Sequence, residues 1–292
     1  MADCEPSARQ LTLDEALDAS ASPAFMDLTV PEYSYMFGFL QADGHLQGSP
    51  GKKGHLTAEL NVRDIEILQR FQRLTPHPSS IRERSRATNF SASHHSATWT
   101  LCSLAARTRL NELGLPYGKK SRAVAPPRGD FCRPDYLRGV IDADGSVGFT
   151  RTGLPFVSLT TESTAIATYF CHYAHEVCGV RRTAGRNTRD SVYNVMLAME
   201  HAQTFAAHLY YPGCLALERK QRAADSLASW KRPETMRAAH TRRAWATHED
   251  RALLRLNDPK AAAEVLGRTQ KSCTIRLWRL RHGEVPMPTT EA

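Results

Sequence analysis

The chain has 292 residues, about twice the length of a typical single domain, so two or three packed units are expected. Hydrophobic residues make up 41% and charged residues 23%, a composition that excludes a fibrous or a disordered chain. No stretch approaches eighteen uninterrupted apolar residues, and the first ten residues are acidic on balance where a signal peptide would be basic. We therefore expect a cytoplasmic protein with no membrane partner.

The net charge of +8 is divided unevenly along the chain. Residues 1–35 carry one Arg against seven acids, so the chain begins with an acidic leader. Residues 36–230 carry 24 Lys and Arg against 16 acids, and residues 231–283 carry 13 against 5. Two basic blocks of this kind favour a polyanionic partner, and nucleic acid is the simplest one.

The seven cysteines are scattered and form no Cys-x-x-Cys pair, which argues against a disulfide framework and against a zinc ribbon. Cys171, His172, His175 and Cys178 do cluster in sequence. Their segment already has the apolar period of a helix, so we interpret them as ordinary helix residues and not as metal ligands.

A long-period repeat organises the chain. Residues 35–45 read YMFGFLQADGH and residues 136–146 read YLRGVIDADGS, so that two Asp-Gly pairs stand 101 residues apart. A Pro-rich segment between the copies, AVAPPRGDFCRPD, is typical of a linker. The chain therefore contains two copies of one structural unit.

Each copy of the motif predicts a buried helix with two small residues on one face. These residues are Gly38 with Ala42 in the first copy, and Gly139 with Ala143 in the second. Residues four apart share a helix face, so each helix has a shallow stripe where another backbone can approach closely. We expect the two helices to pack on each other, and each to end at a glycine in the left-handed conformation.

This packing would bring Asp43 and Asp144 together at the C-terminal ends of adjacent helices. A carboxylate in that place is disfavoured by the negative end of the helix dipole and by its twin. A divalent cation relieves both effects, and Mg²⁺ commonly takes one or two carboxylates together with phosphate oxygens and water. The predicted metal site consists of Asp43 and Asp144 with the following Gly44 and Gly145.

The two motifs resemble those of the LAGLIDADG homing endonucleases, in the monomeric form that carries the motif twice. The second, at Leu137–Gly145, is a close match. The first, at Met36–Gly44, has Gln41 where the family usually has Asp, which leaves the metal-binding acid in place. The resemblance covers about residues 30–230.

The resemblance implies an α+β fold built from two pseudo-symmetric αββαββα repeats, whose antiparallel sheets form a saddle over the DNA major groove. The expected boundaries are an acidic leader over residues 1–30, the first repeat over 31–125, a linker over 126–135 and the second repeat over 136–230.

The resemblance further implies a site-specific DNA endonuclease that hydrolyses both strands of a long double-stranded target. It would use two or more Mg²⁺ ions, with Mn²⁺ as a substitute, and would act as a monomer without an obligate protein partner. Asp43 and Asp144 would hold the metal ions. Lys120 and Lys220 would lie near the scissile phosphates, with Lys119 as the alternative in the first copy.

Arginines in two segments favour a DNA-facing sheet. Arg82, Arg84 and Arg86 alternate, so in a strand all three point to one face. A second group crowds a predicted hairpin at residues 181–189, and basic residues also occupy two predicted turns. The candidate DNA contacts in the two repeats are Arg82, Arg84, Arg86, Arg182, Arg186 and Arg189, with Lys52, Lys53 and Arg151 at the turns.

Residues 240–283 resemble a Myb-like helix-turn-helix domain. They contain a Trp followed by the pair Glu249-Asp250, then a Leu-Gly-Arg-Thr turn and an Arg-rich helix from about Thr269. Such a module would place its recognition helix in a major groove and lengthen the recognised site. The expected contacts are Gln270, Lys271, Thr274 and Arg279 on the outward face, with Arg268 on a phosphate.

Two alternatives share this architecture. One is a transcription regulator that combines a non-cutting LAGLIDADG domain with a helix-turn-helix, and the other is a maturase that binds intron RNA. Retention of both Asp43 and Asp144 favours the nuclease over the regulator, because a pure binder has no use for facing carboxylates beside DNA phosphates. No sequence feature excludes maturase activity as a second function.

Overall fold

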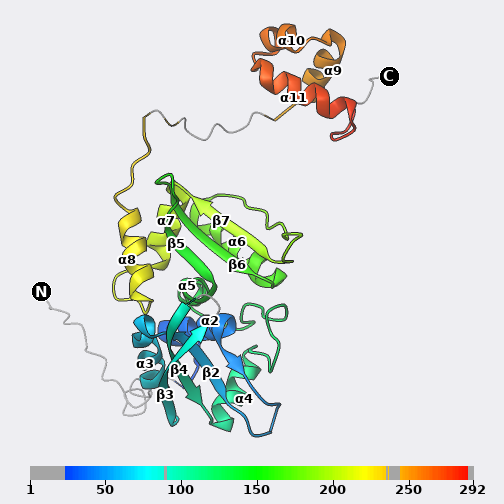
Figure 1. The fold of residues 1–292 in the computed structure, drawn as a ribbon. Coiled ribbons are helices and arrows are strands. Elements are labelled where there is room, and N and C mark those ends of the chain that lie inside the picture. Colours follow the sequence, from blue (N-terminus) through cyan, green and yellow to red (C-terminus); the bar gives the residue numbers. More distant parts are fainter. Residues whose placement is uncertain (1–23, 89–90, 235, 237–243, 289–292) are drawn as a thin grey trace, which may run out of the picture. The chain divides into compact units, whose positions relative to one another are not determined.

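The computed structural model describes residues 24–88, 91–234, 236 and 244–288, so most of the expected acidic leader lies outside the described residues. The chain divides into two units, residues 1–231 and residues 232–292, each with its own hydrophobic core (Figure 1). Mixed helices and antiparallel sheets confirm the α+β class. None of the helices in the described segments is long and apolar enough to span a bilayer.

The first repeat has the expected order αββαββα. Its four strands form one antiparallel sheet in the order β1-β2-β4-β3. The elements are α2 (Pro31–Asp43), β1 (His45–Leu46), β2 (Leu56–Asn61), the 3₁₀ helix η1 (Val62–Asp64), α3 (Ile65–Leu74), β3 (Ser79–Thr88), β4 (Ser91–Leu101) and α4 (Leu104–Glu112).

The second repeat departs from that order because it has three strands, in the order β5-β6-β7. Within residues 179–192, all of which are described, the only strand-like pairing is one bridge between Arg186 and Tyr193. The segment GVRRTAGRNTRDS lacks the alternating apolar residues that a strand would bury. The elements are α5 (Arg133–Asp144), β5 (Gly145–Phe149), β6 (Pro155–Thr161), α6 (Thr164–Cys178), β7 (Tyr193–Ala198), α7 (Glu200–Leu209) and α8 (Glu218–Leu227).

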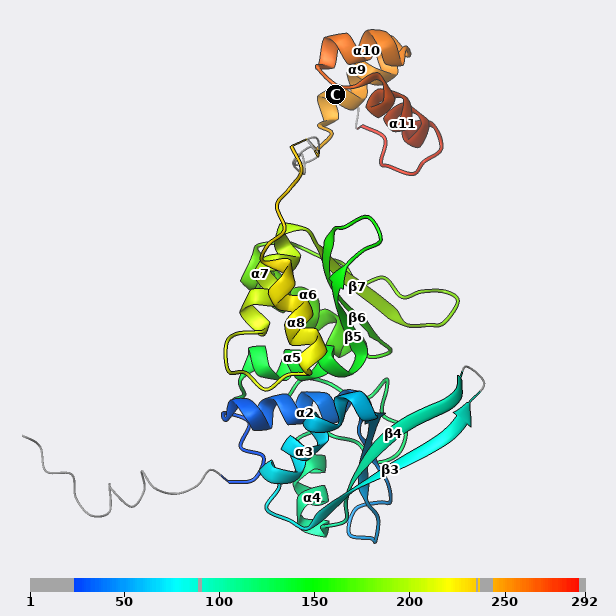
Figure 2. The same cartoon turned by 60° about the vertical axis from the view of Figure 1, so that its left-hand side comes forward.

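Each sheet buries one face and leaves the other open. In β2 the apolar Leu56 and Ala58 are buried, and in β6 the same is true of Val157 and Leu159. The alternation of period two fixes which side chains meet the helices. In Figure 2, helices α3, α7 and α8 lie to the left while strands β3, β4 and β7 extend to the right.

Helices α2 and α5 pack against each other with backbone in close contact, as the small-residue stripes predict. A Cβ atom added to Gly38 would lie 2.1 Å from the carbonyl oxygen of Tyr136. A Cβ atom added to Gly139 would lie 2.1 Å from the carbonyl oxygen of Tyr35. The two contacts are related by the sequence repeat, and neither leaves room for a side chain.

The expectation that Gly44 and Gly145 are left-handed is wrong. Gly44 has φ −70° and ψ 149°, and Gly145 has φ −108° and ψ −174°, so both are extended and lead directly into a strand. Both positions require glycine because neither has room for a Cβ atom. A Cβ on Gly44 would lie 2.6 Å from the Leu40 carbonyl oxygen, and one on Gly145 would lie 2.5 Å from that of Ser158.

The described residues of the smaller unit form three helices, α9 (Thr247–Leu256), α10 (Pro259–Leu266) and α11 (Gln270–Arg281). Its core of buried residues is small: Leu253, Ala262, Cys273, Leu277 and Leu280. Gly267, at φ 60°, ends α10 in the left-handed conformation, and the Thr269 side chain accepts from the Ser272 N–H to begin α11.

We predict that Gly139→Ala lowers the free energy of unfolding of the larger unit by about 3 kcal/mol, because its methyl group collides with backbone rather than with a movable side chain. Denaturant unfolding monitored by circular dichroism measures this. Gly129→Ala is the matched control, since an added Cβ there meets nothing within 4 Å. Equal effects of the two substitutions would contradict close packing of α2 and α5.

Candidate active site

The last residues of α2 and α5, Asp43 and Asp144, lie near each other and are exposed to solvent on one side. Loss of hydration raises the pKa of Asp144 to about 6, and repulsion from Asp43 adds to the shift. Loss of hydration also raises the pKa of Asp43. Both shifts are opposed by two nearby ammonium groups, those of Lys120 and Lys220. Negative charge is therefore concentrated at these helix ends.

The two lysines bind the C-terminal ends of the paired helices. Lys120 donates to the carbonyl oxygens of Gln41 and Ala42, and Lys220 donates to those of Ile141 at 2.6 Å and Asp142 at 2.7 Å. Both ammonium groups are buried, which lowers the pKa of Lys120 and lowers that of Lys220 to about 8. Each therefore neutralises a helix terminus as well as the adjacent carboxylates.

Lys220 also donates to the Gly145 carbonyl oxygen at 2.9 Å, so three acceptors surround its ammonium group. The Gly145 carbonyl oxygen thus accepts from a cation with one of its two lone pairs, and its assignment as a metal ligand stays a prediction. The structure records no such contact for Gly44, whose assignment as a metal ligand stays a prediction.

Sequence reasoning missed a pair of hydrogen bonds that join α2 and α5 across the helix interface. Tyr35 donates to the Asp142 carboxylate at 2.7 Å, and Tyr136 donates to the Gln41 side-chain oxygen at 2.6 Å. The repeat offset of 101 residues relates the two tyrosines and also relates Gln41 to Asp142. The 101-residue offset is the sequence feature from which this pair of hydrogen bonds could have been predicted.

Asp142 is fully enclosed and also accepts from the Tyr210 hydroxyl and the Leu217 N–H, each at 2.7 Å. Leu217 precedes α8, the helix that carries Lys220. The buried carboxylate therefore ties the end of α5 to the start of α8 and fixes where the lysine lies.

The residues at the helix ends suit a hard divalent cation that keeps most of its ligands from water or substrate. No group of three or more His, Cys, Asp or Glu side chains within the described residues is arranged to hold a metal ion. Two exposed carboxylates with a shared excess of negative charge match the way Mg²⁺ is bound by one or two carboxylates together with phosphate oxygens. They do not match a closed zinc or calcium cage.

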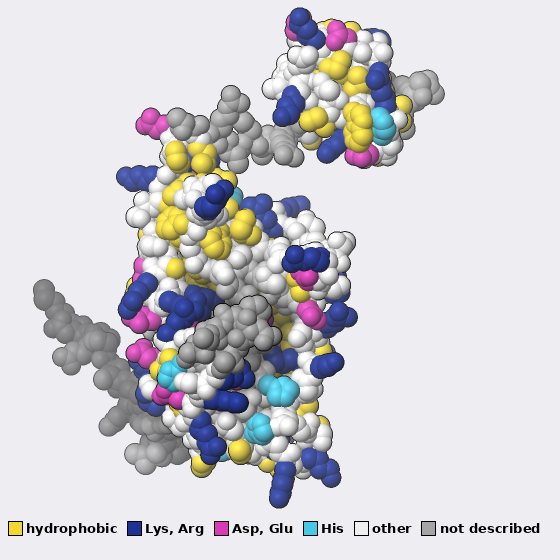
Figure 3. All heavy atoms as spheres, viewed as in Figure 1, with side chains coloured by type: hydrophobic (Ala, Val, Ile, Leu, Met, Phe, Trp, Pro, Cys, Tyr) yellow, Lys and Arg dark blue, Asp and Glu magenta, His cyan; other side chains and the backbone are white. Residues whose placement is uncertain are grey.

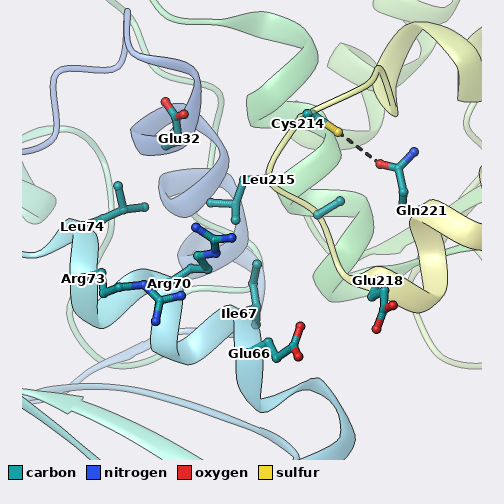
Figure 4. A pocket seen from close by; sticks show the side chains of 12 residues that line it. Glu32, Glu66, Ile67, Arg70, Arg73, Leu74, Cys214, Leu215, Glu218 and Gln221 are labelled. Carbon is teal, nitrogen blue, oxygen red and sulfur yellow. Dashed lines mark hydrogen bonds between the residues drawn. The ribbon is translucent and has the colours of Figure 1, made fainter.

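A cavity of about 450 Å³ adjoins the second helix end, with Ala42, Asp144 and Thr160 among its lining residues. A larger cavity of about 610 Å³ lies elsewhere, between α3 and the loop before α8, and contains neither aspartate. Figure 4 shows Arg70 on its α3 side, opposite Cys214 and Gln221. The charges around the larger cavity are mixed, so it lacks the chemistry of the helix ends.

The alternating arginines of β3 lie where the sequence predicts. Arg82, Arg84 and Arg86 are exposed and pair in register with Thr98, Ser96 and His94 of β4. Directly opposite residues point to the same face of a sheet, so all three arginines lie on the open face of the first sheet. Arg86 forms an ion pair with Glu59 at 3.3 Å.

The arginines before β7, unlike those of β3, do not all lie on the open face of a sheet. Arg182 lines a cavity beside α6, and the Arg186 guanidinium lies 4.9 Å from the Tyr193 ring centroid in the wall of that cavity. Tyr193 and Val195 are two residues apart in β7, so the Tyr193 side chain points to the same helix-covered face of the sheet as Val195. Arg182 and Arg186 therefore lie beside α6 and not over the open face of the second sheet, and their contact with DNA stays a prediction. The missing fourth strand is the reason, since without it the segment turns toward α6.

Other predicted contacts are exposed. Arg189 pairs with Asp190, and its side chain is 84% exposed. Lys52 and Lys53 are exposed in the turn between β1 and β2, and Arg151 is exposed in the turn between β5 and β6. Figure 3 shows Lys and Arg side chains spread over much of one face of the larger unit.

Arg268 of the smaller unit is not available to a phosphate, which corrects its predicted role. Its side chain is 8% exposed, pairs with Glu249 at 2.6 Å and lies 4.1 Å over the Trp245 ring. Arg276 pairs with Asp250 in the same way and also faces Trp245. The acidic pair and the Trp are therefore structural.

The remaining predicted contacts of that unit lie on the surface of α11. Gln270, Lys271, Thr274 and Arg279 are all exposed. They flank or oppose the buried stripe of Cys273, Leu277 and Leu280, which a helical period places on one face.

Comparisons with known proteins give likenesses of fold only. No family model matches the chain, and no curated protein matches it. The structure is similar to the meganuclease I-SmaMI bound to uncleavable DNA, with 10% identity, a TM-score of 0.45, and coverage of 68% of this chain and 87% of that chain. It is similar to the homing endonuclease I-WcaI bound to its recognition sequence, with 9% identity, a TM-score of 0.43, and coverage of 74% and 94%.

A third similar structure is the LAGLIDADG homing endonuclease I-GzeII in complex with its DNA target. It has 9% identity, a TM-score of 0.42, and coverage of 68% of this chain and 89% of that chain. Values this low do not assign a function, so we argue function from the residues of this chain.

We predict that Lys120→Met lowers the free energy of unfolding by about 2 kcal/mol, because two helix-end carbonyls lose their donor and two carboxylates lose a cation. Lys119→Met is the matched control, since Lys119 is adjacent and exposed. Urea unfolding of both variants measures the difference. The same small effect for both lysines would show that Lys120 does not cap α2.

Proposed function

We propose that this protein is a site-specific DNA endonuclease that hydrolyses both strands of a double-stranded target with the help of divalent metal ions. The observation that carries the proposal is the pairing of Asp43 and Asp144 at two abutting helix ends. Nothing in the fold requires two mutually repelling carboxylates there. Neighbouring carboxylates with raised pKa values are typical of functional sites rather than of structural ones.

The environment of the carboxylates supports phosphodiester chemistry. An open face of polar residues and arginines extends from the first helix end, and the chain carries a net charge of +8. Both features favour a polyanion whose backbone phosphates approach the carboxylates. Negative carboxylates and negative phosphates come together only with cations between them.

Asp43 and Asp144 would hold Mg²⁺ ions, which supply positive charge to the scissile phosphate and lower the pKa of the attacking water. The α2–α5 contact would set where these ions lie, because it fixes the positions of both aspartates. Lys120 and Lys220 contribute positive charge beside the carboxylates. Because both are bound to backbone carbonyls, we assign them electrostatic and positioning roles rather than proton transfer.

The smaller unit would act as a second DNA contact of the helix-turn-helix kind. The short connection from α10 through Gly267 to α11, with Lys271 and Arg279 on the exposed face of α11, supports this assignment. The protein would act as a monomer, because the repeat supplies both aspartates from one chain.

We predict that Asp43→Asn and Asp144→Asn each reduce double-strand cleavage at least about 100-fold, while the free energy of unfolding stays the same or rises because the carboxylate repulsion is removed. Incubating a randomised duplex library with Mg²⁺ and sequencing the newly formed ends measures cleavage by the full chain and each variant.

Glu176→Gln is the control for this experiment, since Glu176 is an exposed carboxylate on α6 that pairs with Arg133. It should leave cleavage unchanged. Cleavage that survives both aspartate substitutions would refute the assignment. A wild-type chain that enriches bound duplexes but never cuts them would support the non-cleaving regulator.

We further predict that a chain ending at residue 231 binds duplex DNA with a shallower salt dependence. If Lys271 and Arg279 each neutralise one phosphate, the slope of log K against log salt becomes less negative by about 2. The full chain with Lys271→Ala and Arg279→Ala should show the same change, which separates lost contacts from truncation. An unchanged slope in both would show that α11 does not bind DNA.

A further inference from the structure

The strand registers show that the open faces of the two sheets differ in chemistry. In the first sheet the register places His45, Thr57, Thr100 and Ser80 in one row of the open face, and Glu59, Thr98 and Arg82 in the next row. At the positions whose side chains the structure describes, this face is polar: His45, Thr57, Glu59, Asn61, Ser80, Arg82, Arg84, Arg86, Ser96, Thr98 and Thr100. Arg82 and Arg84 form no ion pair with any side chain that the structure describes.

The open face of the second sheet carries no charged side chain. Its residues, all described, are Ser146, Gly148, Phe156, Ser158, Thr160, Asn194, Met196 and Ala198. Met196 is 50% exposed, and Phe156 and Ala198 are opposite each other in the register. Three apolar side chains are therefore grouped on a surface that the fold leaves uncovered.

Both faces begin at the proposed active site. Two residues after Asp43, His45 is exposed and pairs with Thr57 of the open face. Two residues after Asp144, Ser146 is exposed and pairs with Ser158. A duplex held at the carboxylates thus meets an arginine-bearing sheet on one side and an uncharged, partly apolar sheet on the other.

The open faces of the two sheets favour different base edges in the major groove. Arginine donates two hydrogen bonds to O6 and N7 of guanine, whereas apolar side chains contact the thymine methyl group and asparagine pairs with adenine. Three parallel arginines favour guanines, and Met196 with Phe156 and Asn194 favours thymine and adenine.

We propose, on the basis of the DNA-binding function above, that the recognised site is asymmetric in composition. The half-site under the first sheet is rich in G·C pairs, read by Arg82, Arg84 and Arg86. The half-site under the second sheet is rich in A·T pairs, with thymine methyl groups against Met196 and Phe156.

Binding selection from a randomised duplex library tests this, using the full chain with Mg²⁺ left out so that bound duplexes stay intact. The selected motif should have a G-rich half and an A·T-rich half. Arg84→Ala should lower the preference for guanine about tenfold at one or two positions of the G-rich half only. Met196→Arg should replace thymine with guanine in the other half only. Met196 is half-exposed, so the substitution does not disturb the core.

Arg222→Ala is the control, because Arg222 is exposed on α8 and pairs with Glu218 within that helix. It should leave the motif unchanged. Equal base composition in both halves, or effects of Arg84→Ala and Met196→Arg in the same half, would overturn the asymmetry while leaving DNA binding intact. Failure to enrich any duplex would instead refute the proposed function itself.

Discussion

The backbone contact between α2 and α5 is the constraint on which the rest of the larger unit depends. Two glycines allow the helices to approach until a carbonyl oxygen of one occupies the space of a side chain on the other. The same contact brings two helix C-termini and two aspartates to one place. Concentrating that much negative charge is unfavourable unless cations compensate for it, so the packing and the chemistry have a single cause.

The chain compensates for this charge with cations and satisfies the buried polar groups beside it with hydroxyls. Buried ammonium groups from Lys120 and Lys220 bind the helix-end carbonyls, and tyrosine hydroxyls cross the interface to Gln41 and Asp142. These groups satisfy the backbone and the buried polar atoms, but they leave the outer sides of Asp43 and Asp144 open. The remaining unsatisfied charge is what a substrate-associated metal ion would neutralise.

Much of this arrangement follows from sequence because repeats constrain structure strongly. The 101-residue offset was sufficient to predict the paired helices, the small-residue contact and the positions of Asp43 and Asp144. The alternation of Arg82, Arg84 and Arg86 was sufficient to predict a single exposed face, since strand geometry has a period of two.

Predictions failed where tertiary surroundings decide the outcome. Gly44 and Gly145 are needed for close approach and not for a left-handed turn, which no local pattern distinguishes. Arg268 matches a phosphate contact in sequence, but a buried Glu249 and Trp245 hold it inside the small unit. The segment containing Arg182 and Arg186 forms one bridge and no fourth strand, so these two arginines lie beside α6 and not over the open sheet face.

Crystallographic location of bound Mn²⁺ by anomalous scattering tests most directly whether the paired helix ends form a metal site. Density for Mn²⁺ about 2.2 Å from a carboxylate oxygen of Asp43 or Asp144, with both side chains directed toward the same region, is the predicted result. Mn²⁺ found only at other positions, or aspartate side chains that point away from each other, would contradict it.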